Sequence, residues 1–338
     1  MKKNLTRIIF ILLLILSFIT LEQVLKIKSG HGINQKEGLY AQPKNSIDVA
    51  FMGTSHVHCG INTALLWEEY GIAGYDYSGA EQPLWMTYYY LKELLKYQKP
   101  KMIVLDLYGP ARFKDDYQYE WISENIYGMK FSFNKLQMLS DSVEPHKFFD
   151  YFPDFSSYHS RYDDLNEEDF KYLFKSKEDL SSFKGYTPYT KTVPFERPVI
   201  STDVRRGLTE KSEKYLREII RYTKKHNISL VLIVIPYMIT TEDKETYNQI
   251  MDIAKEEELI FIDYNEYYEP MGLDFSSDFN DDSHLNYEGS SKFSRSLGTF
   301  LSGSGIPDKR EYTGYESWDK HIQLIDEYIN EFRSDDQP

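Results

Sequence analysis

Cysteine is almost absent from this sequence, because Cys59 is the one cysteine among 338 residues. A single thiol cannot form an intramolecular disulfide, and it excludes every metal site that needs several cysteines. We therefore expect a fold that is stabilised by its hydrophobic core, with Cys59 as a small buried side chain. The length is sufficient for one large domain with insertions or for two modest domains.

Positive charge is also scarce. The chain has 39 Lys and Arg against 53 Asp and Glu, which gives a formal net charge of -14 and a pI near 5.1. Proteins that bind nucleic acid neutralise phosphates with clustered basic side chains, often interleaved with aromatic ones. No such run occurs here. Nucleic acid is therefore excluded as the partner.

The N-terminal segment carries the longest apolar run, at residues 8–21. Three basic residues precede it: Lys2, Lys3 and Arg7. A run of about 14 residues suits a signal peptide, but Val24 and Leu25 extend it and no small-x-small cleavage site follows. We therefore expect an uncleaved membrane anchor at residues 1–28, with secretion after cleavage as the alternative. The basic residues predict a cytoplasmic N-terminus and an extracytoplasmic body.

The rest of the chain is divided into a polar linker at 29–45, a main domain at 46–303 and a helical tail at 304–338. In the main domain, apolar runs typical of buried parallel strands alternate with helical patterns. The expected strands lie at residues 47–52, 75–77, 102–107, 230–235 and 259–263. This alternation predicts an α/β fold, a three-layer sandwich with a mostly parallel central sheet.

A long segment at about residues 110–206 interrupts the alternation. It is rich in Tyr, Phe, Asp and Lys and has no clean period of either kind. We interpret it as an insertion over the sheet. Its aromatic side chains indicate either an ordinary packed surface or a cover that stacks on sugars and binds a polymer.

The first candidate site residue is Ser55, in the sequence Gly53-Thr54-Ser55-His56 after the first expected strand. Ligands of open α/β sheets bind at the carboxyl ends of the strands, so Ser55 lies where a nucleophile is expected. Serine at such a turn also caps helices, which is the alternative interpretation.

The second candidate motif is Asp281-Asp282-Ser283-His284, after the last expected strand. An Asp three residues before a His can hold the Nδ1 proton and leave Nε2 facing a nucleophile. Such a pair makes a weak serine hydroxyl reactive. The alternatives are Asp282 in place of Asp281, or a surface histidine beside acidic neighbours.

Two further histidines, His56 and His58, flank Ser55. No acidic ligand lies at metal-binding spacing from them. We therefore expect neither a metal nor a cofactor.

With these two motifs the chain resembles the SGNH or GDSL-like hydrolase superfamily, over residues 47–110 and 211–301. It is most similar to the membrane-anchored branch found with membrane-bound O-acyltransferases. That branch includes proteins that acetylate alginate or peptidoglycan and the teichoic-acid D-alanylation protein. The resemblance implies Ser55 as the nucleophile, His284 as the general base and then acid, and Asp281 as the orienting carboxylate.

The resemblance also implies two backbone donors to an oxyanion, from the nucleophile itself and from Gly79. A plain turn glycine is the alternative interpretation of Gly79. The asparagine that follows the third strand in the family is missing, because Leu107-Tyr108-Gly109-Pro110 stands there. Gln82 is our candidate for the missing amide, beside Asn62 and Asn125.

The expected function is serine-dependent acyl transfer or ester hydrolysis outside the cytoplasm. The resemblance implies O-acetylation or deacetylation of a cell-envelope polysaccharide, together with a membrane-bound O-acyltransferase, by a single-pass protein of the cell membrane. One alternative is a catalytically silent scaffold that presents polymer or carrier to the acyltransferase. Another is a secreted esterase of small esters. The polar insertion has no continuous apolar lid for long acyl chains, which argues against a lipase-like enzyme.

Overall fold

The structure is a computed structural model that describes residues 2–176 and 183–335. Its centre is a five-stranded sheet in which all neighbouring strands are parallel. The strands are β1 Val49–Met52, β2 Gly74–Asp76, β3 Met102–Asp106, β4 Ser229–Val234 and β5 Ile260–Asp263. Their order, β2-β1-β3-β4-β5, is the flavodoxin-like order. The expected α/β class is confirmed.

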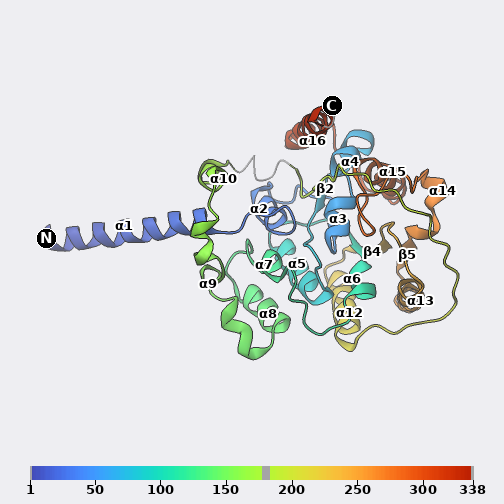
Figure 1. Ribbon diagram of the computed structural model, residues 1–338, viewed down its shortest axis with the longest axis horizontal. Helices are drawn as coiled ribbons and strands as arrows, with labels where there is room; N and C mark the ends of the chain where they lie inside the picture. The colour runs from blue at the N-terminus through green and yellow to red at the C-terminus, as the bar shows by residue number, and fades with distance from the viewer. Residues whose placement is uncertain (1, 177–182, 336–338) are drawn as a thin grey trace.

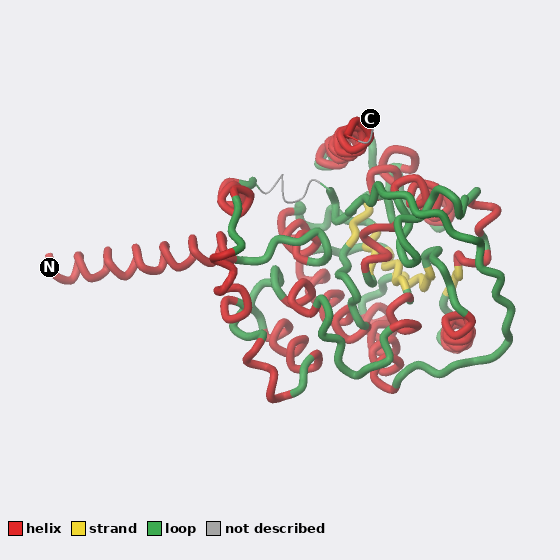
Figure 2. The backbone as a smooth tube through the Cα atoms, in the orientation of Figure 1, coloured by secondary structure: helices red, strands yellow, loops and turns green. Residues whose placement is uncertain are grey.

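Helices cover both faces of this sheet (Figures 1 and 2). Ala50 and Met52 of β1 belong to the core beneath α5 (Leu84–Tyr97), α12 (Glu210–Lys225) and α13 (Thr241–Glu256). Val49 and Phe51 belong to the opposite core, with α4 (Thr63–Tyr70) and α15 (Tyr287–Gly303). Successive side chains of a strand point to opposite faces, so both sets are buried. This two-sided burial explains why the strands appear in the sequence as continuous apolar runs.

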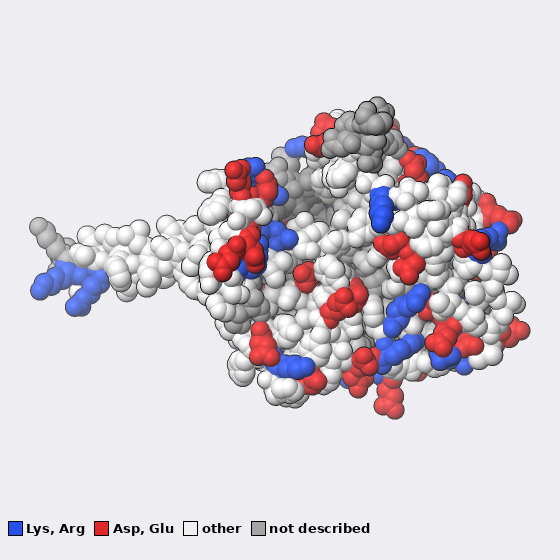
Figure 3. Space-filling view, in the orientation of Figure 1, with Lys and Arg blue, Asp and Glu red and all other residues white. Residues whose placement is uncertain are grey.

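Helix α1 (Lys2–Leu25) extends away from the body as a single rod (Figure 1). Its residues Lys3–Leu25, with a mean hydropathy of 2.6, are long and apolar enough to cross a membrane. The only charged side chains on the exposed rod, among those described, are Lys3 and Arg7 near its free end (Figure 3). The apolar N-terminal helix that the sequence predicts is therefore present, and its length and composition would allow it to cross a membrane.

The segment expected to be a polar linker, 29–45, instead contains a helix packed on the body, α2 (Ile33–Ala41). Ile33 and Leu39 belong to the main core. Even Lys36 is buried, and its ammonium group donates to the Tyr90 hydroxyl at 2.6 Å and to two carbonyl oxygens. Burial holds the pKa of this lysine well below its usual value. The segment is polar in overall composition, but one face of α2 is apolar and packs on the core.

The expected insertion consists mostly of short helices in its first part. These are α6 Tyr108–Arg112, α7 Ile122–Ile126, α8 Phe133–Ser142, η1 Pro145–Asp150, α9 Phe155–Tyr158, η2 His159–Asp163, α10 Glu167–Lys171 and η3 Tyr172–Phe174. From residue 183 to 209 the chain is an irregular loop. The Thr187 N–H donates to the His58 carbonyl oxygen and the Val193 N–H to that of Phe279. This loop therefore crosses the carboxyl edge of the sheet, beside Ser55.

The remaining elements are α3 Ser55–Gly60, η4 Tyr264–Glu266, α14 Tyr268–Met271 and α16 Glu316–Asp335. Helix α16, in the expected helical tail at 304–338, packs outside α4, where the rings of Trp318 and Trp67 lie 5.9 Å apart. The tail thus adds to the packing around the sheet on that side.

Candidate active site

Ser55 is the first residue of α3, immediately beyond the end of β1. Gly53 makes the turn between them with a φ of +147°, and a Cβ there would lie 3.0 Å from the Asp106 Cβ. Glycine is therefore required by both conformation and space. The N-cap of α3 is Thr54, whose hydroxyl accepts the His56 N–H at 3.3 Å. Because Thr54 caps the helix, the alternative interpretation of Ser55 as the cap is wrong.

The structure brings the three predicted catalytic residues together. Ser55 Oγ lies 2.7 Å from His284 Nε2. His284 Nδ1 lies 2.9 Å from one Asp281 carboxylate oxygen and 3.1 Å from the other. A carboxylate that accepts the Nδ1 proton leaves the Nε2 lone pair directed at the serine hydroxyl. The arrangement can therefore activate Ser55 as a nucleophile.

Several donors hold the Asp281 carboxylate in place. It accepts the N–H groups of Ser283 and His284, both at 2.9 Å, and the Asn280 side-chain amide at 2.8 Å. Partial burial opposes ionisation of Asp281, but the hydrogen bonds from His284, Asn280 and Ser283 outweigh it, so the pKa lies well below its usual value. Asp281 is therefore ionised at neutral pH.

The neighbouring Asp282 makes different contacts. Its carboxylate accepts the Ser283 hydroxyl at 3.1 Å, and its backbone carbonyl accepts the Met238 N–H at 2.9 Å. The side chain of Asp282 is exposed. The geometry thus selects Asp281 over Asp282 as the partner of His284.

Aromatic side chains lie around His284. The rings of His56 and Tyr108 stack with their centroids 3.6 Å apart, and the His56 ring lies 5.5 Å from that of His284. Tyr189, from the loop at 183–209, meets His284 edge to face at 5.5 Å. The Tyr108 hydroxyl lies 3.2 Å from Ser283 Oγ. An aromatic ring therefore occupies the position after β3 where the resemblance implies an asparagine.

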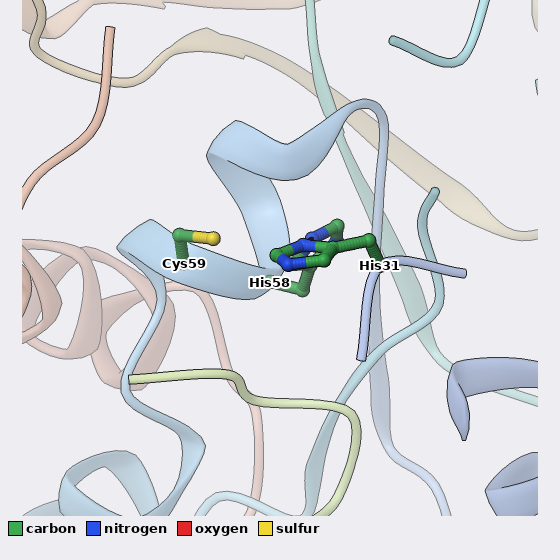
Figure 4. Close-up of side chains that lie close together, drawn as sticks. All are labelled: His31, His58 and Cys59. Carbon is green, nitrogen blue, oxygen red and sulfur yellow. Dashed lines mark hydrogen bonds between the residues drawn. The ribbon is translucent and has the colours of Figure 1, made fainter. Parts of the chain in front are cut away.

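A second polar cluster is formed by His31, His58 and Cys59, the last two from α3, the helix that Ser55 begins (Figure 4). His31 Nδ1 lies 3.1 Å from His58 Nε2, and His58 Nδ1 lies 2.9 Å from Ser78 Oγ. The Cys59 thiol hydrogen-bonds to Tyr189, and burial raises the pKa of this thiol.

Imidazole and thiolate are donors that Zn²⁺ takes, at separations of about 3.3–3.8 Å between ligand atoms. In this cluster the three atoms lie within 4.8 Å of one another, and the two imidazole nitrogens, His31 Nδ1 and His58 Nε2, are 3.1 Å apart. The protonated thiol and the hydrogen-bonded imidazoles are already satisfied. We therefore interpret the cluster as a hydrogen-bonded support of the site and assign no metal to it.

Gly79 and Gln82, the predicted oxyanion residues, differ in their placement. The Gly79 N–H donates to the Gly53 carbonyl at 3.4 Å, so it lies beside the turn that carries the nucleophile. The Gln82 amide is buried, donates to Asn125 Oδ1 at 2.9 Å and accepts the Thr87 hydroxyl at 2.9 Å. Gln82 and Asn125 therefore pack against the loop that contains Gly79 and help to fix its position.

The third candidate amide, Asn62, is the N-cap of α4. Its side-chain oxygen accepts the Leu65 N–H at 3.1 Å, and its amide nitrogen donates to Ser291. These contacts give Asn62 a role in helix capping.

Replacing Gly79 with alanine should lower the free energy of unfolding by about 1–3 kcal/mol. The added Cβ would lie 2.2 Å from Asn125 Oδ1 and 3.0 Å from Gln82 Nε2. Urea denaturation followed by circular dichroism measures the change. Gly207→Ala is the matched control, since nothing lies within 4 Å of a Cβ there. Equal stability of the two variants would contradict the close packing behind Gly79.

Comparison with known proteins adds little to this geometry. No family model matches the chain, and no curated protein matches it. One match among solved structures is the crystal structure of a candidate acylhydrolase from Bacteroides fragilis, at 12% identity and a TM-score of 0.41, covering 82% of this chain and 99% of that chain. A likeness at this distance says nothing about the reaction. The case for function therefore depends on the side chains themselves.

Proposed function

We propose that this protein is a serine-dependent enzyme of acyl transfer or ester hydrolysis, with Ser55, His284 and Asp281 as its catalytic residues. One observation carries the proposal. The hydrogen-bonded series runs from Ser55 Oγ to His284 Nε2, at 2.7 Å, and from His284 Nδ1 to Asp281 Oδ1, at 2.9 Å. Residues from two distant parts of the chain meet in the geometry that nucleophilic catalysis by serine needs.

The reaction would proceed in two halves. His284 takes the proton of the Ser55 hydroxyl while Oγ attacks the acyl carbonyl carbon, and His284 then gives that proton to the leaving alkoxide. In the second half His284 deprotonates the acceptor hydroxyl, which attacks the acyl group on Ser55, and the proton returns to Oγ. Water as the acceptor gives hydrolysis, and a sugar hydroxyl gives transfer.

Backbone N–H groups would stabilise the tetrahedral oxyanion. The Ser55 N–H opens α3 and so has no acceptor within the helix. The Gly79 N–H is the second candidate donor, because its present hydrogen bond to Gly53 is long, at 3.4 Å. The site thus relies on the main chain where the related family uses an amide side chain.

The proposed acceptor is a hydroxyl group of a cell-envelope polysaccharide, and the proposed acyl donor is supplied by a membrane-bound O-acyltransferase, with acetyl as the group. Helix α1, with Lys3 and Arg7 near its free end, favours a body outside the cytoplasm. The aromatic ring of Tyr189 beside His284, and that of Tyr108 near Ser283, suit stacking on sugar rings.

A second candidate function is the catalytically silent scaffold, which presents polymer or carrier to the acyltransferase. The observation in its favour is that the Gln82 amide is committed to Asn125 and Thr87. Normal polymer acetylation in cells that carry Ser55→Ala would support the scaffold against the enzyme.

Reaction with a fluorophosphonate probe tests the proposed nucleophile. The full-length protein in detergent should be labelled, and peptide mass mapping should place the label on Ser55. Labelling should disappear in Ser55→Ala, fall about 100-fold or more in His284→Ala, and stay unchanged in Ser302→Ala, an exposed serine of α15. Folded wild-type protein that is neither labelled nor active on acetyl esters would overturn the proposal.

A further inference from the structure

The last turn of α1 is built into the body of the protein. Val24 and Leu25 are buried. The Tyr158 hydroxyl donates to the Glu22 carboxylate at 3.0 Å, and the Arg161 guanidinium donates to the Leu25 carbonyl at 2.7 Å. Because these contacts come from both the helix side chains and its terminal carbonyl groups, the direction of α1 is fixed relative to the body.

The exposed part of α1 is about as long as a bilayer is thick, so no exposed length of helix would separate the membrane from the body. Residues 3–21 are exposed, and residues 22–25 are partly or fully buried. At about 1.5 Å per residue the exposed part measures about 28 Å, close to the ~30 Å hydrocarbon thickness of a bilayer. If α1 spans the membrane, the body must therefore begin where the hydrocarbon ends.

One side chain of the body contacts α1 within its apolar stretch. The ring of Phe155, on α9, lies 5.2 Å from the ring of Phe18. Phe18 is about one helical turn nearer to the free end than Glu22, where the helix becomes partly buried. If α1 spans the membrane, the contact between Phe155 and Phe18 therefore lies at the depth of the bilayer.

Exposed aromatic side chains surround this junction. Tyr162, Phe170 and Phe174 are 67%, 52% and 86% exposed. They lie on η2, α10 and η3, and all three elements contact α1. Figure 1 shows α9 and α10 at the end of the body from which α1 emerges. We name these three residues the aromatic collar.

We propose that the aromatic collar inserts into the outer interface of the lipid bilayer and holds the body directly on the membrane in one orientation. Aromatic side chains are favoured at the level of the lipid headgroups. Continuity with α1 argues for lipid as the occupant, because the collar surrounds the point where the helix enters the body. This inference does not depend on the proposed chemistry.

The orientation would place the active site near the membrane. His31 follows Leu25 by six positions, which limits the distance between them to about 22 Å. The ring of His31 lies 6.1 Å from that of Tyr189, which in turn contacts His284 at 5.5 Å. A donor at the bilayer surface would thus be at most about 3–4 nm from Ser55.

Fluorescence quenching by lipids tests the collar in the full-length protein. Phe170→Cys and Phe174→Cys are labelled with an environment-sensitive dye and placed in phosphatidylcholine nanodiscs with and without doxyl-labelled lipid. Ile15→Cys in α1 is the positive control. Val199→Cys is the negative control, because this side chain is 90% exposed and lies near Lys244 of α13 and Asp263 of β5, elements at the end of the body opposite α1 (Figure 1). Cys59 can stay, since it is fully buried, and unsubstituted protein checks that it takes no dye.

The expected result is loss of most of the fluorescence at positions 15, 170 and 174, and no loss at position 199. Quenching at 15 with full fluorescence at both collar positions would overturn the proposal, because the body would then stand away from the lipid. No quenching at 15 would also overturn it, since α1 would not be in the bilayer. Quenching at the collar that requires an added membrane protein would assign the surface to that partner instead. Fluorophosphonate labelling of Ser55 is independent of all these outcomes.

Discussion

Ser55→Ala should lower kcat for hydrolysis of p-nitrophenyl acetate by about 10⁴- to 10⁶-fold. The substitution removes the oxygen that lies 2.7 Å from His284 Nε2, and with it the covalent route through an acyl-enzyme. The backbone N–H of residue 55 stays, so binding and part of the oxyanion stabilisation remain. Initial rates of the full-length protein in detergent give the value, and the burst of an acyl-enzyme should vanish with the serine.

The double variant Ser55→Ala/His284→Ala makes this experiment sharper. Residues that act as a unit are not additive, so the double variant should be about as slow as either single variant. Two independent effects would multiply instead. Ser302→Ala on the outer surface of α15 is the matched control and should keep the wild-type rate. Substantial activity in Ser55→Ala would show that another group performs the reaction.

The fold could be predicted from the sequence where both faces of an element are buried. The apolar runs at 102–107 and 230–235 became β3 and β4 because each strand packs under helices on two sides. Helix α12 is recognisable in the sequence, since one face of it is apolar and the rest is charged. Helix α2 was not expected, because its apolar face has few residues and its buried Lys36 looks like a solvent-exposed one.

The insertion could not be predicted in detail for a different reason. Its short helices depend on contacts with α1 and with each other, such as the contact between Phe155 and Phe18. Such contacts produce no regular spacing of apolar residues in the sequence. The aromatic richness of this segment was visible, but its concentration around α1 was not.

The proximity of Ser55 and His284 could be predicted because the ends of parallel strands meet at one edge of the sheet. Ser55 and the 281–284 loop both follow strands, so their meeting required only the fold class. His31 gave no signal, since it lies in a segment that seemed to be a linker. Tyr189 gave none either, because it stands in an irregular loop that crosses the edge of the sheet. Both reach the site through tertiary packing alone.

The choice between Asp281 and Asp282 depends on how one tight loop closes. Phe279 and Leu285 form an antiparallel bridge, and the Asn280 N–H donates to the His284 carbonyl at 2.9 Å. The bridge closes residues 280–284 into a tight turn, and in this turn the Asp281 carboxylate faces the His284 ring. Two adjacent carboxylates cannot be distinguished from spacing, because the turn that separates them is itself a product of the fold.

Asp281→Asn should lower kcat about 10⁴-fold, because an amide can donate to Nδ1 and so favour the wrong imidazole tautomer. The loss should persist from pH 6 to 9, since the low pKa of Asp281 keeps the wild-type carboxylate ionised throughout. Asp282→Asn is the matched control. It removes the same charge one residue away, but its carboxylate contacts Ser283 and not the histidine, so the rate should change by no more than about threefold. Equal losses in the two variants would mean that His284 depends on the negative charge of the loop in general. A larger loss in Asp282→Asn would exchange the roles of the two residues. The ratio of the two rates therefore measures what orientation of His284, apart from charge, contributes to the reaction.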